Sequence, residues 1–139
     1  MKKRLAFAVL VALAVYVVAE QIASALTPPP APTTNPDGYF WLLSSISAVV
    51  CFLAAFAGSW IARGRFLKLA LLLWAIPTAA AMVIGYRLQL PAEPINFGVF
   101  ALRNLPMLSA TLAGTLAGVV LGKFLTGHKR VADGTQAAT

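Results

Sequence analysis

Four long apolar runs, separated by short polar or proline-rich segments, dominate the pattern of the chain. They cover residues 5–26, 39–62, 66–87 and 104–125 of the 139-residue sequence. A helix rises ~1.5 Å per residue, so crossing the ~30 Å apolar core of a bilayer takes about 20 residues. The apolar positions are continuous rather than alternating, which favours helices over β-barrel strands. We therefore predict an all-α integral membrane protein with four transmembrane helices in one domain, residues 1–139.

The segments between the runs differ in character. Residues 27–38 contain five prolines and predict an extended, proline-rich outer loop. Residues 89–104 are more apolar and predict an outer loop at the membrane interface, in which a short helix lying on the outer leaflet is one alternative. Only Arg63 to Arg65 link the second and third runs, so we expect those two helices to be antiparallel neighbours. The polar tail, residues 127–139, is expected to be disordered in the cytoplasm.

The composition agrees with a chain whose solvent is lipid. Hydrophobic residues make up 60% of the sequence and charged residues 11%, with a mean hydropathy of +0.82. A soluble domain carries about 25% charged residues, because its surface must face water. The composition thus excludes a soluble domain, and the high hydrophobicity excludes a disordered chain. A disulfide scaffold is excluded because Cys51 is the one cysteine in the sequence.

The net charge of +7 comes from basic residues at the ends of the runs, so we expect no nucleic-acid partner. Nine of the eleven basic residues share one side if the N-terminus is cytoplasmic: Lys2, Lys3, Arg4, Arg63, Arg65, Lys68, Lys123, Lys129 and Arg130. Arg87 and Arg103 then lie outside. The positive-inside rule therefore predicts an antiparallel bundle with both termini in the cytoplasm, placed in a bacterial inner membrane.

The first run has a second interpretation as a signal peptide. Residues 2–4 are basic, residues 5–19 are apolar, and residues 23–25 (Ala-Ser-Ala) match a small-x-small cleavage pattern. Cleavage after residue 25 would leave three transmembrane helices. The length of the apolar core, and the membrane-embedded character of the rest of the chain, favour an uncleaved first helix.

The fourth run carries small residues at a spacing of four. They are Ala110, Gly114, Gly118 and Gly122. Residues four apart lie on one helix face, and small side chains let two backbones approach closely, which is a main source of helix association in lipid. The second run has a weaker counterpart in Ala54 and Gly58, which makes it the natural partner within the chain. A contact with another membrane protein or a second copy is the alternative.

Glu20 is the single carboxylate within an apolar run, where an ionisable side chain is costly and marks a candidate functional site. It lies 16 residues after Arg4, or ~24 Å along a helix, in the outer third of the bilayer. We predict an outer-leaflet polar cluster in which Glu20 pairs with Arg87 or Arg103. A proton or cation site of a transporter is the alternative.

No motif for catalysis, metal binding or a bound cofactor is present in the sequence. The one histidine, His128, lies in the tail, and Cys51 suits packing better than nucleophilic attack. We therefore expect no enzyme, no metal site and no cofactor.

These features favour a small inner-membrane accessory or assembly protein that acts through helix–helix contacts in a larger membrane complex. Its partners would be the lipid bilayer and either another membrane protein or a second copy of the chain. The alternative is a small transporter or an oligomeric channel, which is disfavoured because few polar residues occur within the runs. The residues that such a pathway could use are Ser44, Ser45, Ser47, Thr78, Thr111 and Thr115.

Overall fold

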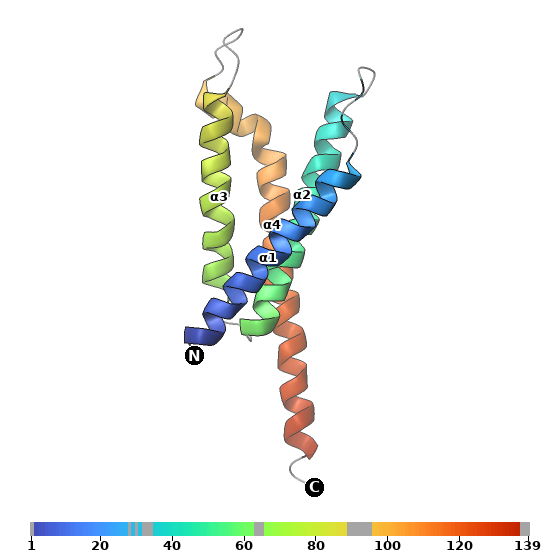
Figure 1. Cartoon of the computed structure of the whole chain (residues 1–139), viewed down its shortest axis with the longest axis vertical. Helices are drawn as coiled ribbons and strands as arrows, with labels where there is room; N and C mark the ends of the chain where they lie inside the picture. The colour runs from blue at the N-terminus through green and yellow to red at the C-terminus, as the bar shows by residue number, and fades with distance from the viewer. Residues whose placement is uncertain are drawn as a thin grey trace.

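The computed structural model confirms four helices and describes residues 2–27, 29, 31, 35–62, 66–88 and 96–136. The helices are α1 (Lys2–Leu26), α2 (Pro36–Ala62), α3 (Leu67–Arg87) and α4 (Phe97–Gln136). Each contains a stretch that is long and apolar enough to cross a membrane. Successive helices run in opposite directions, so the described part of the chain is an all-helical, up-and-down bundle (Figure 1).

Asparagines begin two of the helices. The side-chain oxygen of Asn35 accepts a hydrogen bond of 3.1 Å from the backbone N–H of Asp37 at the start of α2. The side-chain oxygen of Asn96 accepts one of 2.8 Å from the N–H of Gly98 at the start of α4. Asparagine is a preferred N-cap because it satisfies an N–H that has no partner in the first turn.

Helix α4 is longer than the predicted fourth span at both ends. Residues 97–104, predicted to be part of an interfacial loop, form its first turns. In Figure 1 these turns run across from the end of α3 before the helix turns along the bundle. Pro106 lies inside α4, and a proline within a helix removes one hydrogen bond and favours a bend.

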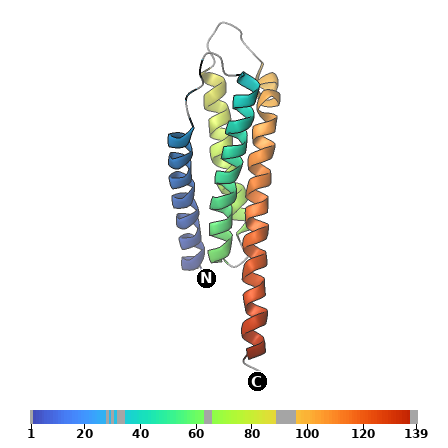
Figure 2. The same cartoon turned by 90° about the vertical axis from the view of Figure 1, so that its right-hand side faces the viewer.

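The other end of α4 continues through residues 127–136, where we expected disorder. As a result α4 extends past the other three helices (Figure 2). No proline follows Pro106 in the sequence, so every later N–H can bond to the preceding turn. The rest of the predicted outer loops, at positions 28, 30, 32–34 and 89–95, lies outside the described residues.

Helix α2 is central to the packing. It contacts α4 along much of its length and α1 on another side, whereas α3 packs mainly against α4. The helices are thus arranged side by side in the order α1, α2, α4, α3. The short link does place α3 antiparallel to α2, but the contact between these two helices is small. A link fixes two helices only where they are joined, and side-chain packing decides which neighbour each one follows.

The two ends of the bundle are named here by their charges. We call the end at which α1 begins the basic end, because Lys3, Arg4 and Lys68 lie at the starts of α1 and α3. Arg87 and Arg103 lie at the opposite end. Helices α1 and α3 are close together at the basic end and diverge toward the opposite end (Figure 1).

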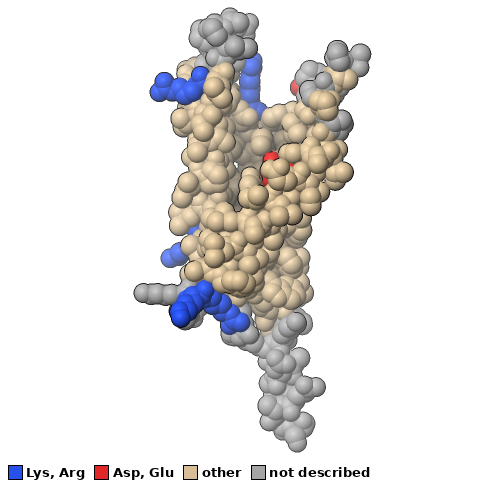
Figure 3. Space-filling model, viewed as in Figure 1, with Lys and Arg blue, Asp and Glu red and all other residues tan. Residues whose placement is uncertain are grey.

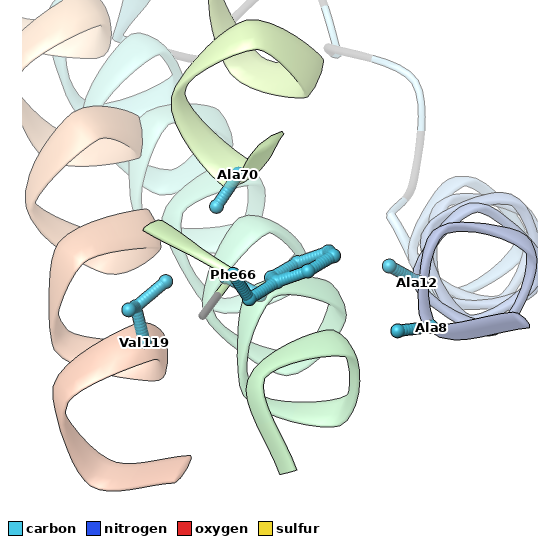
Figure 4. Packing of buried hydrophobic residues seen from close by; sticks show 6 residues of the cluster. Ala8, Ala12, Phe66, Ala70 and Val119 are labelled. Carbon is cyan, nitrogen blue, oxygen red and sulfur yellow. The ribbon is translucent and has the colours of Figure 1, made fainter. Parts of the chain in front are cut away.

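The buried core is small and lies at the basic end. Phe66, just before α3, has an exposed fraction of 0%, and its ring lies where the helices converge (Figure 4). The other buried residues of this cluster are Ala8, Ala12, Ala55, Ala70 and Val119. Alanines leave room for one large ring between the helices. Because Ala8 and Ala12 belong to α1, cleavage after residue 25 would remove part of this core, and the signal-peptide interpretation stays a hypothesis.

Candidate functional site

The glycine stripe of α4 lies against α2. A Cβ added at Gly114 would collide with the carbonyl oxygen of Ala48, and one at Gly118 with the carbonyl oxygen of Phe52. A Cβ at Gly122 would lie 2.8 Å from the Cβ of Ser59. The two helices therefore approach backbone to backbone, as small residues allow in lipid. Within the chain, the stripe serves the contact between α2 and α4.

A buried hydrogen bond accompanies this close approach. The hydroxyl of Ser59 donates to the carbonyl oxygen of Val119 over 2.9 Å. Such bonds between membrane helices contribute ~0.6–2 kcal/mol. Ala110, one turn before Gly114, is half-buried. The contact between α2 and α4 thus combines backbone proximity with a directed polar bond.

The small residues predicted as partners on α2 lie on another face of that helix. Gly58 lies against the ring of Phe66, and Ala54 lines a central cavity. The atoms of α2 nearest to the three glycines of α4 belong instead to Ala48, Phe52, Ala55, Phe56 and Ser59. These positions share one face at 3.6 residues per turn, and that face is rotated away from Ala54 and Gly58. The partner helix is the expected one, but the contact uses different residues.

A cavity of about 650 Å³ lies between the four helices. It opens sideways between α1 and α3, because these two helices diverge and are not packed along their length. Figure 3 shows the molecule hollowed on this face. Phe66, Ala12, Ala55 and Ala70 close the cavity at the basic end. The result is a pocket with a floor at one end and a mouth that would face lipid in a membrane.

Four polar side chains of the cavity wall donate hydrogen bonds within the protein. The indole N–H of Trp74 on α3 donates to the hydroxyl of Thr111 on α4 over 3.1 Å. Thr111 and Thr115 donate in turn to carbonyl oxygens one turn earlier in α4, each over 2.9 Å. The amide of Asn104 does the same over 2.9 Å. Three further hydroxyls on the wall belong to Tyr16, Ser47 and Thr78.

Aromatic side chains join α3 and α4 at the opposite end. The rings of Tyr86 and Phe97 meet edge to face with centroids 5.2 Å apart. The ring of Phe100 lies close to Gly85, where an added Cβ would be 3.2 Å from the ring. The ring centroids of Phe100 and Tyr86 are 5.9 Å apart. Since α3 has little contact with α2, these aromatic contacts hold it in place across the cavity from α1.

Glu20 lies on the cavity wall, in the part of α1 toward the opposite end. It is half-buried, and Arg87 and Arg103 are exposed and do not line the cavity. Among the described residues the structure has no ion pair between Glu20 and either arginine. The three members of the predicted polar cluster therefore lie toward one end of the molecule, but only Glu20 belongs to the cavity.

Sequence reasoning did not find the cavity, although it did single out some of its hydroxyl residues. Ser47, Thr78, Thr111 and Thr115 line it, whereas Ser44 and Ser45 instead donate to carbonyl oxygens of their own helix. The wall residues that sequence reasoning missed include Tyr16, Trp74, Ala81 and Met82. The sequence did contain one signal for the cavity: the second, third and fourth runs each carry hydroxyl side chains within an apolar segment.

The described residues contain no group of three or more potential metal-ligating side chains. Cys51 is a free, half-buried thiol on the cavity wall. Comparison with known proteins gives no match to a family model, to a curated protein or to a solved structure. Any functional proposal for this chain therefore depends on the geometry of the cavity and of the helix contacts.

Proposed function

We propose that this chain is a small integral protein of the bacterial inner membrane that binds an apolar or amphiphilic molecule taken from the lipid. In this respect it would act as a small transporter does. The cavity of about 650 Å³, open between α1 and α3, carries the proposal. Its volume falls within the ~300–1,000 Å³ of small-molecule sites, and an apolar wall with few polar groups is typical of them.

The accessory or assembly function is the second candidate. In the sequence it was favoured by the glycine stripe, but those glycines lie against α2 and are not free to contact another protein. One observation still supports this function: the open seam between α1 and α3 could receive a transmembrane helix of another protein or of a second copy. A small ligand and a partner helix would compete for the same space, so one experiment separates them.

The orientation we propose places both termini and the basic end in the cytoplasm. Lys3, Arg4 and Lys68 would then lie at the cytoplasmic headgroups, as the positive-inside rule requires. Alkaline-phosphatase fusions at Pro32 and Asn96 should be active, and fusions at Gly64 and Thr135 inactive. Activity of the fusion at Gly64 would show that the protein has the opposite orientation.

Ligand binding can be tested through Cys51, since it is the one cysteine of the sequence and lines the cavity. The purified protein would be placed in lipid nanodiscs and alkylated with N-ethylmaleimide, with and without the neutral amphiphile N,N-dimethyldecanamide. Intact-protein mass spectrometry gives the rate, and Cys51→Ala corrects for labelling elsewhere. At ten times its Kd, a ligand that excludes the reagent should lower the rate about tenfold by mass action.

A matched pair of variants checks that this protection arises in the cavity. Ala80 and Ala81 are both exposed, but only Ala81 lines the cavity. Ala81→Phe should fill part of the space, slow alkylation and remove the effect of the amide. Ala80→Phe should behave as wild type. If the amide protects both variants equally well, ligand binding in the cavity is refuted and the accessory function becomes the better candidate.

A further inference from the structure

The cavity presents one kind of charge to a ligand. Among the described residues, those that line it include a single acidic side chain, Glu20, and no lysine, arginine or histidine. Asp37, the other carboxylate whose side chain is described, lies in the first turn of α2 and does not line the cavity. A carboxylate in an apolar segment is costly unless a positive or hydrogen-bonding group accompanies it. The cavity thus has negative charge without a basic partner on its own wall.

The other polar groups of the wall are neutral. The donors of Trp74, Thr111 and Thr115, and one N–H of the Asn104 amide, are used within the protein. Further hydroxyls on the wall, which can both donate and accept, belong to Tyr16, Ser47 and Thr78. An anionic head would meet repulsion from Glu20, whereas an ammonium head would find a charge-assisted partner.

The position of Glu20 also determines how a bound ligand would be oriented. Glu20 lies eight residues beyond Ala12 on α1, or ~12 Å along the helix. Ala12 belongs to the floor around Phe66, and the wall near the floor is alanine and leucine. A head bound at Glu20 would therefore leave an apolar tail directed toward Phe66. The sideways mouth between α1 and α3 would admit such a molecule from the bilayer.

We propose that the cavity selects lipophilic amines, with Glu20 as the counter-charge of their ammonium head. This inference rests on the proposed ligand-binding function and names its ligand class. Arg87 and Arg103 are the described basic residues toward the same end, and both are exposed and off the cavity wall. Neither arginine therefore supplies the positive charge that would neutralise Glu20 inside the cavity.

The test uses three ten-carbon probes that differ in the charge of the head. N,N-dimethyldecylamine is cationic at neutral pH, N,N-dimethyldecanamide is neutral, and decanoate is anionic. Protection of Cys51 from N-ethylmaleimide in nanodiscs would be measured for each. The amine should protect wild type at a concentration about tenfold lower than the amide, a difference that one charge-assisted contact can supply, and decanoate should be the weakest.

Variants assign this preference to one carboxylate. Glu20→Gln should leave folding and abundance nearly unchanged, because no protein ion pair is lost, and should bring the amine and the amide to equal protection. Asp37→Asn removes a carboxylate outside the cavity and should keep the wild-type order. Each probe is compared at its concentration in the nanodisc lipid, so differences in partition between the probes do not enter the comparison.

The outcomes separate the two proposals. Equal protection by amine and amide in wild type would overturn the selection of amines and leave the binding function intact. A preference that persists in Glu20→Gln would overturn the role of Glu20. Protection by none of the three probes would refute the binding function itself. The order of the three probes in wild type does not depend on whether any variant folds.

Discussion

Replacing Gly118 with leucine is expected to separate α2 from α4 and to leave little folded protein in the membrane. A Cβ at this position would collide with the carbonyl oxygen of Phe52 and would lie 2.9 Å from the backbone nitrogen of Phe56. Backbone atoms cannot rotate away as the end of a side chain can. The helices must therefore move apart along the contact that joins the centre of the bundle.

The size of the effect follows from how many contacts would be lost together. Adding one methylene to a packed interior costs about 1–3 kcal/mol, and leucine adds a whole branched side chain. Moving α4 away from α2 also breaks the hydrogen bond from Ser59 to Val119 and many dispersion contacts. Typical proteins are stable by only ~5–15 kcal/mol, so the loss is a large share of the total.

Gly127 provides a matched control on the same helix. Nothing lies within 4 Å of a Cβ added there, so Gly127→Leu should retain wild-type abundance. Leu116→Ile, at an exposed position of α4, should also do little. Abundance would be followed by immunoblot of membranes, and unfolding by heating in mild detergent. If Gly118→Leu stays abundant but loses a co-purifying protein, the stripe serves an intermolecular contact and the packing against α2 is dispensable.

The four helices could be predicted because each depends on a local property. A run of about 20 apolar residues must satisfy its own backbone hydrogen bonds in lipid, whatever surrounds it. The ends of the helices were harder to predict. Residues 97–104 were assigned to an interfacial segment separate from the fourth span, because Arg103 and Asn104 interrupt the apolar pattern, yet an N-cap at Asn96 starts one helix that continues into that span. A few polar side chains at an interface do not prevent helical hydrogen bonding.

The cavity could not be predicted because it depends on relations between helices. Periodicity shows that Gly114, Gly118 and Gly122 share a face, but not which face of α2 receives them. Ala54 and Gly58 were equally suitable by composition, and the ring of Phe66 occupies the space beside Gly58 instead. Glu20 was correctly singled out as unusual, but its place on a cavity wall follows from the divergence of α1 and α3.

Replacing Phe66 with alanine is expected to destabilise the bundle and to open the floor of the cavity. The ring is fully buried among α1, α2, α3 and α4 (Figure 4). Substitutions of buried phenylalanine by alanine cost about 3–5 kcal/mol in water-soluble cores. Here separated helices stay in lipid, so the transfer part is small and lost packing dominates. We therefore expect a loss near the lower limit, about 3 kcal/mol, seen as a lower unfolding temperature in mild detergent.

The open floor gives this variant a second signature that simple destabilisation would not produce. The ring separates the cavity from the basic end, and Cys51 lies on the cavity wall. A charged methanethiosulfonate reagent, which does not dissolve in lipid, should therefore modify Cys51 several-fold faster in folded Phe66→Ala than in wild type. Phe66→Leu keeps most of the volume and should react slowly, and Phe7→Ala removes an exposed ring of the same size. Equal rates in Phe66→Ala and Phe7→Ala would mean that the alanines around position 66 close the floor without the ring.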